Sequence, residues 1–473
     1  MAANADGCTT AVNHFLSAIE KGKELNAFTN IYSEEALQRA KELDEKRARN
    51  DSVKKLHGVI IAIKDVICYK DHEVTAASGI LKGFKSIYNS TAVQRLLDED
   101  AIIIGTCNCD EFAMGSTNEN SVYGNVLNAI DTTKVPGGSS GGSAVAVQAG
   151  MCMISLGSDT GGSVRQPADF CGIVGIKPTY GRISRYGLIA YASSFDQIGI
   201  FANNIEDIET ALEVISGPDD FDSTAIQQLP KDNSSDINVN KKYRIAYFKE
   251  AIEHPSLDKE ISNSIIELLN KLKADGHHVE AVDFNLLEYI VPAYYVLTTA
   301  EASSNLSRFD GVRFGHRTKE PVANLADFYK HSRSEGFGKE VQKRILLGTF
   351  VLSAGYYDAY YSKAQKVRRM LVDKTIAVFK DFDVIVLPTS PTTAFTIGEK
   401  TDDAIAMYLA DIYTVFANLT GIPGISVPLF KHSNGLPFGL QAMTNKQDEV
   451  TLLQFSKLLM QRYKTYQHLA INE

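Results

Sequence analysis

The chain has 473 residues, of which 44% are hydrophobic and 22% charged, so it can bury a large core. Its formal net charge of -9 argues against a chain that binds nucleic acid unaided, because phosphate binding needs a basic face. No apolar run approaches the ~20 residues that span a bilayer, and the first ten residues lack the charged-then-apolar pattern of a signal peptide. We therefore expect a cytoplasmic protein without a membrane segment.

The spacing of the six cysteines indicates free, buried thiols. They form no CxxC pair, and no second ligand pair follows Cys107 and Cys109 at zinc spacing. A reducing compartment keeps such thiols free. We therefore expect neither a disulfide framework nor a metal site in this chain.

The N-terminal segment, about residues 1–50, is predicted to be helical. Ser33 can cap a helix whose first turn carries Glu34 and Glu35, where the helix dipole favours negative charge. An apolar stripe at helical spacing follows and consists of Ala36, Leu37, Ala40 and Leu43.

A Gly- and Ser-rich core follows, at about residues 51–220. The run at 57–64 is short, β-branched and almost continuously apolar, which favours a buried strand, and 101–105 has the same character. Between them, residues 91–99 suit a helix. Strands that alternate with helices predict an α/β sheet.

The second half, at about residues 243–473, continues the pattern with additional helices. A polar stretch at 230–242 predicts an exposed joint before it. The expected strands lie at 243–248, 278–284 and 382–387, and the expected helices at 258–274 and 449–463. The simplest architecture is one α/β domain over residues 1–473, with a mixed sheet and helical insertions in the second half.

Two Gly- and Ser-rich segments are the strongest local signals: PGGSSGGS at 136–143 and SDTGGSVRQP at 158–167. The first could be a flexible linker, but the small apolar residues after it suit tight packing beneath a sheet. A phosphate-binding loop would end in a lysine followed by Ser or Thr, which is missing. A nucleophile elbow matches at Ser139 or Ser140, but it lacks a preceding strand and a later histidine motif, so it is the weaker alternative.

A third interpretation joins both segments to a lysine. A serine hydroxyl is a poor nucleophile until a base takes its proton. A neutral lysine can act as that base where burial lowers its pKa, and Lys64 ends an apolar run. A second hydroxyl could relay the proton to the leaving group, and consecutive glycines could present backbone N–H groups to an oxyanion. Taken alone, Lys64 is more simply a strand-end lysine paired with Asp65.

Lys64, Ser139 and Ser163, with the two segments around the serines, resemble the amidase signature family in residue type and in separation. The resemblance extends from LHGVIIAIKD at 56–65 to the C-terminal helix. It implies the amidase signature fold, an α/β fold whose large mixed β-sheet core is covered by helices on both faces.

The resemblance implies a Ser–cis-Ser–Lys catalytic unit. In that unit Ser163 is the nucleophile, Ser139 is the bridging serine with a cis peptide bond, and Lys64 is the base that starts the proton relay. Backbone N–H groups would form the oxyanion hole, and they belong to Thr160, Gly161, Gly162 and Ser163. Ser140 would be structural. Asp159 and Arg165 would brace the loop, or they would form a plain salt bridge, which is an equally good interpretation of this pair.

Three more strings resemble one branch of that family, the A subunits of tRNA-dependent amidotransferases. They lie at 110–128, 300–317 and 343–350. The resemblance implies that Tyr295, Arg344 and Asp411 bind glutamine. The chemistry agrees, because the α-carboxylate of an amino acid suits Arg344 and its α-ammonium suits Asp411. Arg344 could instead pair with a neighbouring acid on its own helix.

The resemblance also implies partners. Such a protein hydrolyses L-glutamine and passes ammonia to a B subunit, where ATP and Mg²⁺ serve to convert misacylated Glu-tRNA(Gln) to Gln-tRNA(Gln). A C subunit completes the heterotrimer, and the glutamine-hydrolysing chain itself holds no cofactor. Use of Asp-tRNA(Asn) stays open. A stand-alone hydrolase of small amides is the alternative, and the intact triad disfavours a catalytically dead scaffold.

Overall fold

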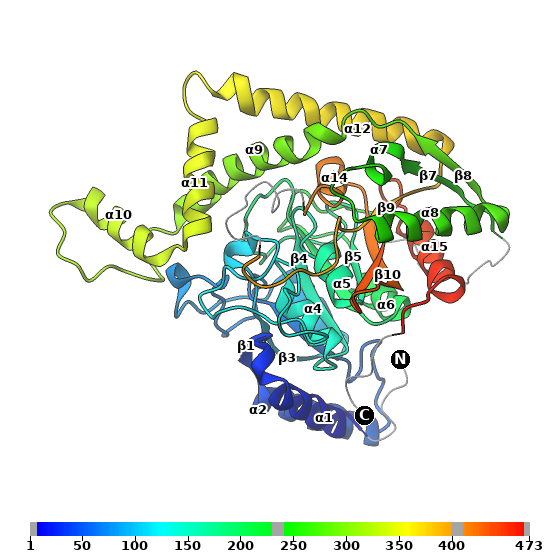
Figure 1. Cartoon of the computed structure of the whole chain (residues 1–473). Coiled ribbons are helices and arrows are strands. Elements are labelled where there is room, and N and C mark those ends of the chain that lie inside the picture. The colour runs from blue at the N-terminus through cyan, green and yellow to red at the C-terminus, as the bar shows by residue number, and fades with distance from the viewer. Residues whose placement is uncertain (1–6, 229–240, 400–409, 468–473) are drawn as a thin grey trace.

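A single eleven-stranded sheet organises the computed structural model, which describes residues 7–228, 241–399 and 410–467 (Figure 1). Along the sheet the order is β1-β3-β2-β4-β6-β5-β10-β11-β9-β7-β8. The strands are β1 (Phe28–Ile31), β2 (Ile60–Lys64), β3 (Ile102–Cys107), β4 (Ile154–Asp159), β5 (Val174–Lys177), β6 (Gln197–Ala202), β7 (Arg244–Phe248), β8 (His278–Val282), β9 (Val384–Pro388), β10 (Gly424–Lys431) and β11 (Pro437–Met443).

The sheet is mixed, as predicted. Strands β3, β2 and β4 are parallel neighbours, and so are β9, β7 and β8. The strands between these two groups pair antiparallel, through β6, β5, β10 and β11. The sheet therefore runs without interruption from the N-terminal half of the chain into the C-terminal half. The division of the chain into one domain stays a prediction.

The helices of the described residues cover both faces of this sheet. They are α1 (Cys8–Lys21), α2 (Ser33–Ala48), α3 (Thr91–Asp98), α4 (Gly141–Gln148), α5 (Arg165–Cys171), α6 (Ile205–Ile215), α7 (Lys249–Ile252), α8 (Lys259–Ala274), α9 (Leu287–Asn305), α10 (Leu325–Gly336), α11 (Lys339–Val351), α12 (Lys363–Asp381), α14 (Val415–Thr420) and α15 (Glu449–Arg462). Short 3₁₀-helical segments lie at Lys23–Leu25, Gly79–Leu81, Glu111–Ala113 and Leu306–Arg308, and a π-helical segment lies at Tyr357–Ser362.

The alternation of side chains along a strand explains the two covered faces. In β2, Ile61 and Ile63 belong to a hydrophobic cluster with α3, α6 and α15, whereas Ile60 and Ala62 belong to a second cluster with α1, α2, α4 and α5. All five residues of β2 are buried, because parallel strands β3 and β4 flank it and helices cover both sides. This burial extends to Lys64, the last residue of the strand.

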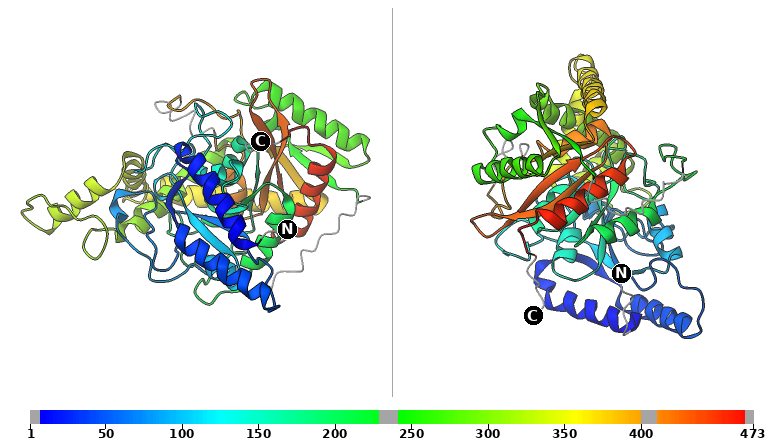
Figure 2. Two further views of the ribbon diagram at one scale, coloured as in Figure 1. Left: turned by 90° about the horizontal axis from the view of Figure 1, so that it is seen from below. Right: turned by 90° about the vertical axis from the view of Figure 1, so that its right-hand side faces the viewer.

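The helical insertions of the second half form a separate layer. Helix α9 packs against α11 and α12, while α10 projects to one side of the molecule (Figure 1). In Figure 2, α1 and α2 lie on the opposite side of the molecule from α12. The layer of α9 and α11 is the part of the second half that reaches the site described below.

Most predicted elements are confirmed with boundaries shifted by a few residues. The predicted helical N-terminal segment also contains strand β1, and the predicted cap of α2 is wrong. Ser33 is the first residue of α2, and Tyr32 occupies the N-cap position without a side-chain bond. The N–H of Tyr32 donates to the carbonyl oxygen of Ile104 at 2.9 Å, so the chain passes from strand pairing directly into the helix. The predicted exposed joint falls mostly on residues 229–240, which lie outside the described residues.

Candidate active site

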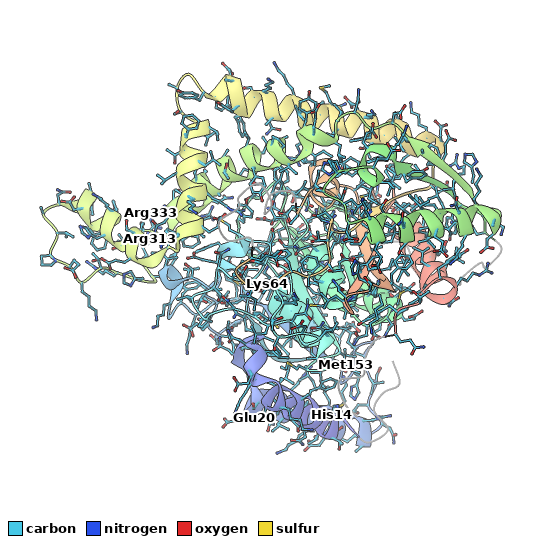
Figure 3. The ribbon with its side chains drawn as sticks, viewed as in Figure 1. His14, Glu20, Lys64, Met153, Arg313 and Arg333 are labelled. Carbon is cyan, nitrogen blue, oxygen red and sulfur yellow. The ribbon has the colours of Figure 1, made fainter. Side chains whose placement is uncertain are left out.

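The side-chain nitrogen of Lys64 lies among three serine hydroxyls at the centre of the molecule (Figure 3). Its Nζ is 2.7 Å from Ser139 Oγ, 2.8 Å from Ser140 Oγ and 2.9 Å from Ser158 Oγ. Ser158 belongs to β4, the parallel neighbour of β2, whereas the other two serines come from the turn before α4. The alternative pairing of Lys64 with Asp65 is wrong, because the Asp65 carboxylate accepts from the backbone N–H groups of Thr75 and Ala77 instead.

Burial controls the protonation of Lys64. It lowers the pKa of the amine to about 8, although the acidic groups of Cys109, Asp110, Asp159 and Asp196 act in the opposite direction. A neutral amine has two N–H donors and one lone pair, so one of the three hydroxyls can donate to it. Lys64 therefore has the surroundings of a base that exchanges a proton with a hydroxyl.

The neighbouring contacts separate Ser139 from Ser140. The Ser140 hydroxyl donates to the backbone carbonyl of Ser158 at 3.0 Å, so its single hydrogen is already engaged and it accepts from Lys64. In the described residues the Ser139 hydroxyl has no such second bond. The peptide bond before Ser139 is cis, as the resemblance implied. Ser139 is thus the serine of this pair that is able to pass a proton to Lys64.

Ser163 lies directly beside this cluster. Its carbonyl oxygen accepts the N–H of Ser140 at 3.3 Å, which joins the two Gly- and Ser-rich segments side by side. The Ser163 side chain is buried, and within the described part of the chain its hydroxyl has no hydrogen-bond partner. Gln166 adds a second connection, since its Oε1 accepts the N–H of Gly138 at 2.9 Å.

A buried ion pair braces the loop before Ser163. Arg165 contacts the Asp159 carboxylate through Nε at 3.1 Å and Nη2 at 3.0 Å, and Asn418 also donates to that carboxylate. Burial by itself raises the pKa of Asp159, but the charge and hydrogen bonds of Arg165 outweigh it and hold the pKa at about 2. The Asp159 carboxylate is therefore ionised at neutral pH, and its pairing with Arg165 fits the predicted bracing role of the two residues.

Asp159 also determines which backbone groups are free for an oxyanion. The N–H of Gly162 donates to Asp159 Oδ1 at 2.9 Å, so this predicted donor is already occupied. The N–H groups of Thr160, Gly161 and Ser163 have no partner among the described residues. They remain the candidates for an oxyanion hole.

The three residues predicted to bind glutamine come together from distant elements. Tyr295 lies on α9, Arg344 on α11, and Asp411 in the turn before α14. The Tyr295 hydroxyl is 3.3 Å from Asp411 Oδ2, and the Arg344 guanidinium lies over the Tyr295 ring, 5.4 Å from its centroid. All three are more than nine-tenths buried. The guanidinium of Arg344 and the carboxylate of Asp411 thus both lie next to the Tyr295 side chain.

Each charge in this group has its own support. Arg344 Nε donates to Glu340 one turn away at 2.8 Å, and Nη1 donates to the Tyr191 hydroxyl at 2.9 Å. The alternative pairing of Arg344 with an acid on its own helix therefore exists. The guanidinium of Arg344 nevertheless also lies over the Tyr295 ring. Burial raises the pKa of Asp411 to about 7, although a hydrogen bond from Ser116 and the charge of Arg344 oppose it.

Comparison with known proteins decides the family. The family model described as Amidase matches residues 10–453. The A subunit of glutamyl-tRNA(Gln) amidotransferase from Chlorobium phaeobacteroides is 50% identical over 449 residues, which are 94% of each chain. The protein of the same name from Koribacter versatilis is 50% identical over 447 residues, or 94% of this chain and 93% of the relative. The chain belongs to the amidase family.

A solved structure agrees with this assignment and confirms the resemblance to amidase signature enzymes. The crystal structure of the glutamyl-tRNA(Gln) amidotransferase A subunit from Thermotoga maritima is 37% identical in sequence and superposes with a TM-score of 0.81. The match covers 98% of this chain and 93% of that one. The mixed sheet with its covering helices is therefore the amidase fold, as predicted.

Some residues of this amidase site carried no prediction. Ser158, the third serine whose hydroxyl contacts Lys64, lies in the 158–167 segment that contains Ser163. Its place in that segment was the available signal. Ser116, which contacts Asp411, lies in the 110–128 string that carries the family resemblance, whereas Tyr191, which contacts Arg344, lies in none of those strings. Their roles depend on segments that meet only in the folded chain.

Other features of this amidase lie outside the site. All six cysteines are free and buried, as predicted. Across residues 7–228, 241–399 and 410–467, no group of three or more His, Cys, Asp or Glu side chains could hold a metal ion. In the same ranges no helix has the length and apolar character needed to cross a membrane.

Proposed function

We propose that this amidase is the glutamine-hydrolysing component of a tRNA-dependent amidotransferase, its A subunit. The observation that carries the proposal is the pair of opposite charges, Arg344 and Asp411, next to the serine cluster of Lys64. Asp411 precedes Thr414, whose hydroxyl reaches Gly161, so the acid and the oxyanion loop are neighbours. A free amino acid presents both an α-carboxylate and an α-ammonium, and this pair suits both.

The proposed reaction uses the residues of this site in sequence. Glutamine binds with its α-carboxylate on Arg344 and its α-ammonium on Asp411, which directs the side-chain amide toward Ser163. Lys64 takes a proton through Ser139 as the Ser163 hydroxyl attacks the amide carbon. The resulting oxyanion is stabilised by backbone N–H groups of the loop at 160–163. The relay then returns a proton to the nitrogen, which leaves as ammonia.

Hydrolysis of the acyl-enzyme completes the cycle. Water attacks the glutamyl ester on Ser163, and the same relay takes a proton from that water. Glutamate is released and Ser163 regains its hydroxyl. The chain needs no cofactor for these steps.

The ammonia is consumed in a partner. In the proposed heterotrimer, a B subunit uses ATP and Mg²⁺ to activate misacylated Glu-tRNA(Gln), and ammonia converts it to Gln-tRNA(Gln). A C subunit joins the A and B subunits, and the complex works in the cytoplasm. The net charge of -9 on this chain supports a division of labour in which a partner binds the RNA.

Ammonia release from L-glutamine tests the proposal. Wild type, Ser163→Ala and Ser143→Ala are compared, each with and without co-expressed B and C subunits and Glu-tRNA(Gln). We expect Ser163→Ala to lose roughly 10⁴-fold or more in kcat, as serine hydrolases do without their nucleophile. Ser143→Ala is the matched control, because this buried hydroxyl donates to the carbonyl of Leu156 and does not touch Lys64.

The partners are expected to raise the rate of the wild type. Ammonia release from simple amides but not from glutamine, with no effect of partners, would instead establish the alternative, a stand-alone hydrolase of small amides.

A further inference from the structure

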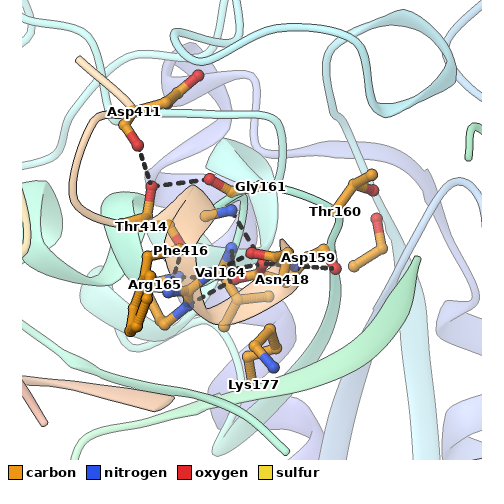
Figure 4. Close-up of polar contacts among 12 residues, drawn as sticks. Asp159, Thr160, Gly161, Val164, Arg165, Lys177, Asp411, Thr414, Phe416 and Asn418 are labelled. Atoms are coloured by element: carbon orange, nitrogen blue, oxygen red, sulfur yellow. Dashed lines mark hydrogen bonds and ion pairs between the residues drawn. The ribbon is translucent and has the colours of Figure 1, made fainter. Parts of the chain in front are cut away.

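Thr414 lies between the oxyanion loop, residues 160–163, and the turn that carries Asp411 (Figure 4). Its buried hydroxyl is 2.7 Å from the Gly161 carbonyl oxygen and 3.2 Å from the Asp411 carbonyl oxygen. A hydroxyl has one hydrogen to donate. The Asp411 carbonyl already accepts the N–H groups of Thr414 and Val415, so the Thr414 hydroxyl donates to Gly161.

The Thr414 hydrogen bond holds the carbonyl end of the Gly161–Gly162 peptide, and a second hydrogen bond holds its N–H end. The Gly161 carbonyl and the Gly162 N–H belong to one planar unit. The carbonyl accepts from Thr414 at 2.7 Å, and the N–H donates to Asp159 Oδ1 at 2.9 Å. Two of the candidate oxyanion donors, the N–H groups of Gly161 and Ser163, lie on the two sides of this unit. Its orientation therefore controls their direction.

Arg165 closes these contacts into a ring. Its Nε donates to Asp159 at 3.1 Å, and its Nη1 donates to the Thr414 carbonyl oxygen at 2.7 Å. The ring thus runs from Asp159 through Arg165 and Thr414 to the Gly161–Gly162 peptide and back to Asp159 (Figure 4). The side chains of Asp159, Arg165 and Thr414 are all buried, so water does not compete for the hydrogen bonds of this ring.

Gly162 allows the Thr414 side chain to pack closely against the backbone of the loop at 160–163. Its φ is 128°, a conformation that side chains with a Cβ rarely adopt. A Cβ added there would lie 2.2 Å from Thr414 Oγ1 and 2.5 Å from Thr414 Cβ. The threonine therefore packs directly on the loop.

We propose that Thr414 is a positioning residue for amide hydrolysis. Its hydroxyl holds the Gly161–Gly162 peptide so that the neighbouring N–H groups face the developing oxyanion. It does so from the turn that also places Asp411, and this link to glutamine recognition rests on the proposed function. The support of the oxyanion applies to any amide substrate.

The test compares Thr414→Val, which removes the hydroxyl at nearly constant shape, with Thr414→Ser, which keeps it. We expect Thr414→Val to lower kcat for ammonia release from glutamine roughly 10- to 100-fold, because a small misplacement of oxyanion donors is costly. KM should stay within about 3-fold, and Thr414→Ser should keep kcat within about 3-fold of wild type.

Thr420→Val is the matched control. Thr420 is a buried threonine at the other end of α14, and its hydroxyl donates to the Phe416 carbonyl at 2.8 Å. This variant should retain the wild-type kcat. Thermal unfolding is measured for every variant, and Thr414→Ala replaces Thr414→Val if the valine prevents folding.

Three outcomes would overturn the role of Thr414. They are an unchanged kcat in the variant without the hydroxyl, a Thr414→Ser enzyme as slow as Thr414→Val, and an equal loss in Thr420→Val. Butyramide, which is glutamine without its α-groups, separates this inference from the proposed function. If wild type hydrolyses butyramide but not glutamine, the proposed function fails, while a kcat loss in Thr414→Val on butyramide still supports Thr414.

Discussion

The region around Lys64 and the region around Arg344 both bury a basic side chain, but they give it different neighbours. Lys64 contacts three neutral hydroxyls, and burial lowers its pKa to about 8. Burial also lowers the pKa of Arg344, but Tyr191, Tyr295 and Glu340 outweigh it, and the pKa lies well above its usual value. A base must lose its proton, whereas a carboxylate clamp must keep its charge. The two environments suit the tasks proposed for Lys64 and Arg344.

Of the changes that compare these two regions, the largest expected effect comes from the region around Lys64. Lys64→Met should lower kcat for ammonia release about 10³-fold or more, because the variant has no base to accept the proton of Ser163 through Ser139. The measurement is the rate of ammonia release with glutamine and with butyramide. The loss should be equal for both substrates, since Lys64 acts on the amide and not on the α-groups.

Lys177→Met is the control for Lys64→Met, because Lys177 is a second fully buried lysine with a lowered pKa. Its Nζ donates to the backbone carbonyls of Pro178 and Ile422, so its removal leaves two buried acceptors without a donor. We expect a loss of about 1–3 kcal/mol in the free energy of unfolding, with kcat per folded molecule little changed. Equal losses of kcat in both variants would contradict the special role of Lys64.

A smaller effect is expected from a change at Arg344, and it distinguishes the Arg344 region from the Lys64 region. Arg344→Met should raise KM for glutamine roughly 10- to 100-fold, because a charge-assisted contact to the α-carboxylate is lost. Hydrolysis of butyramide, which has no carboxylate, should be unchanged. Arg333→Met serves as the control, since this arginine donates to the carbonyls of Leu306 and Phe309 outside the site. An equal loss on both substrates would place Arg344 in the support of the serine cluster instead.

The smallest expected effect is a difference between glutamine and butyramide in how kcat/KM depends on pH. Lys64 must be neutral to act as a base, so kcat/KM for butyramide should rise with pH and level off above about 8. In the proposed binding mode, the α-ammonium of glutamine needs the Asp411 carboxylate, whose pKa burial raises to about 7. Below that value, kcat/KM for glutamine should fall more steeply than kcat/KM for butyramide.

Asp411→Asn should remove this additional steepness and leave the dependence on Lys64. Profiles of kcat/KM between about pH 6 and pH 9 measure both effects. Parallel profiles for the two substrates in wild type would contradict the assignment of the α-ammonium to Asp411.

The strand that ends at Lys64 shows how much the sequence could predict. A β-branched apolar run predicts a buried strand, and β2 is buried along its whole length. The roles of Ser139 and Ser163 came from the family resemblance, because glycine-rich strings match several kinds of motif. Ser33 shows the limit of local rules, since a preceding strand bond at Tyr32 replaced the expected cap.

The sequence by itself determined the fold class, the buried position of Lys64 and the membership of the amidase family, because these depend on local periodicity and on long motifs. The tertiary structure alone decided which side chains meet. The hydroxyl of Thr414 reaches Gly161 across 253 positions of the chain, and Ser116 reaches Asp411 across 295. Such contacts exist because the continuous sheet brings the two halves of the chain together, and no local pattern encodes that meeting.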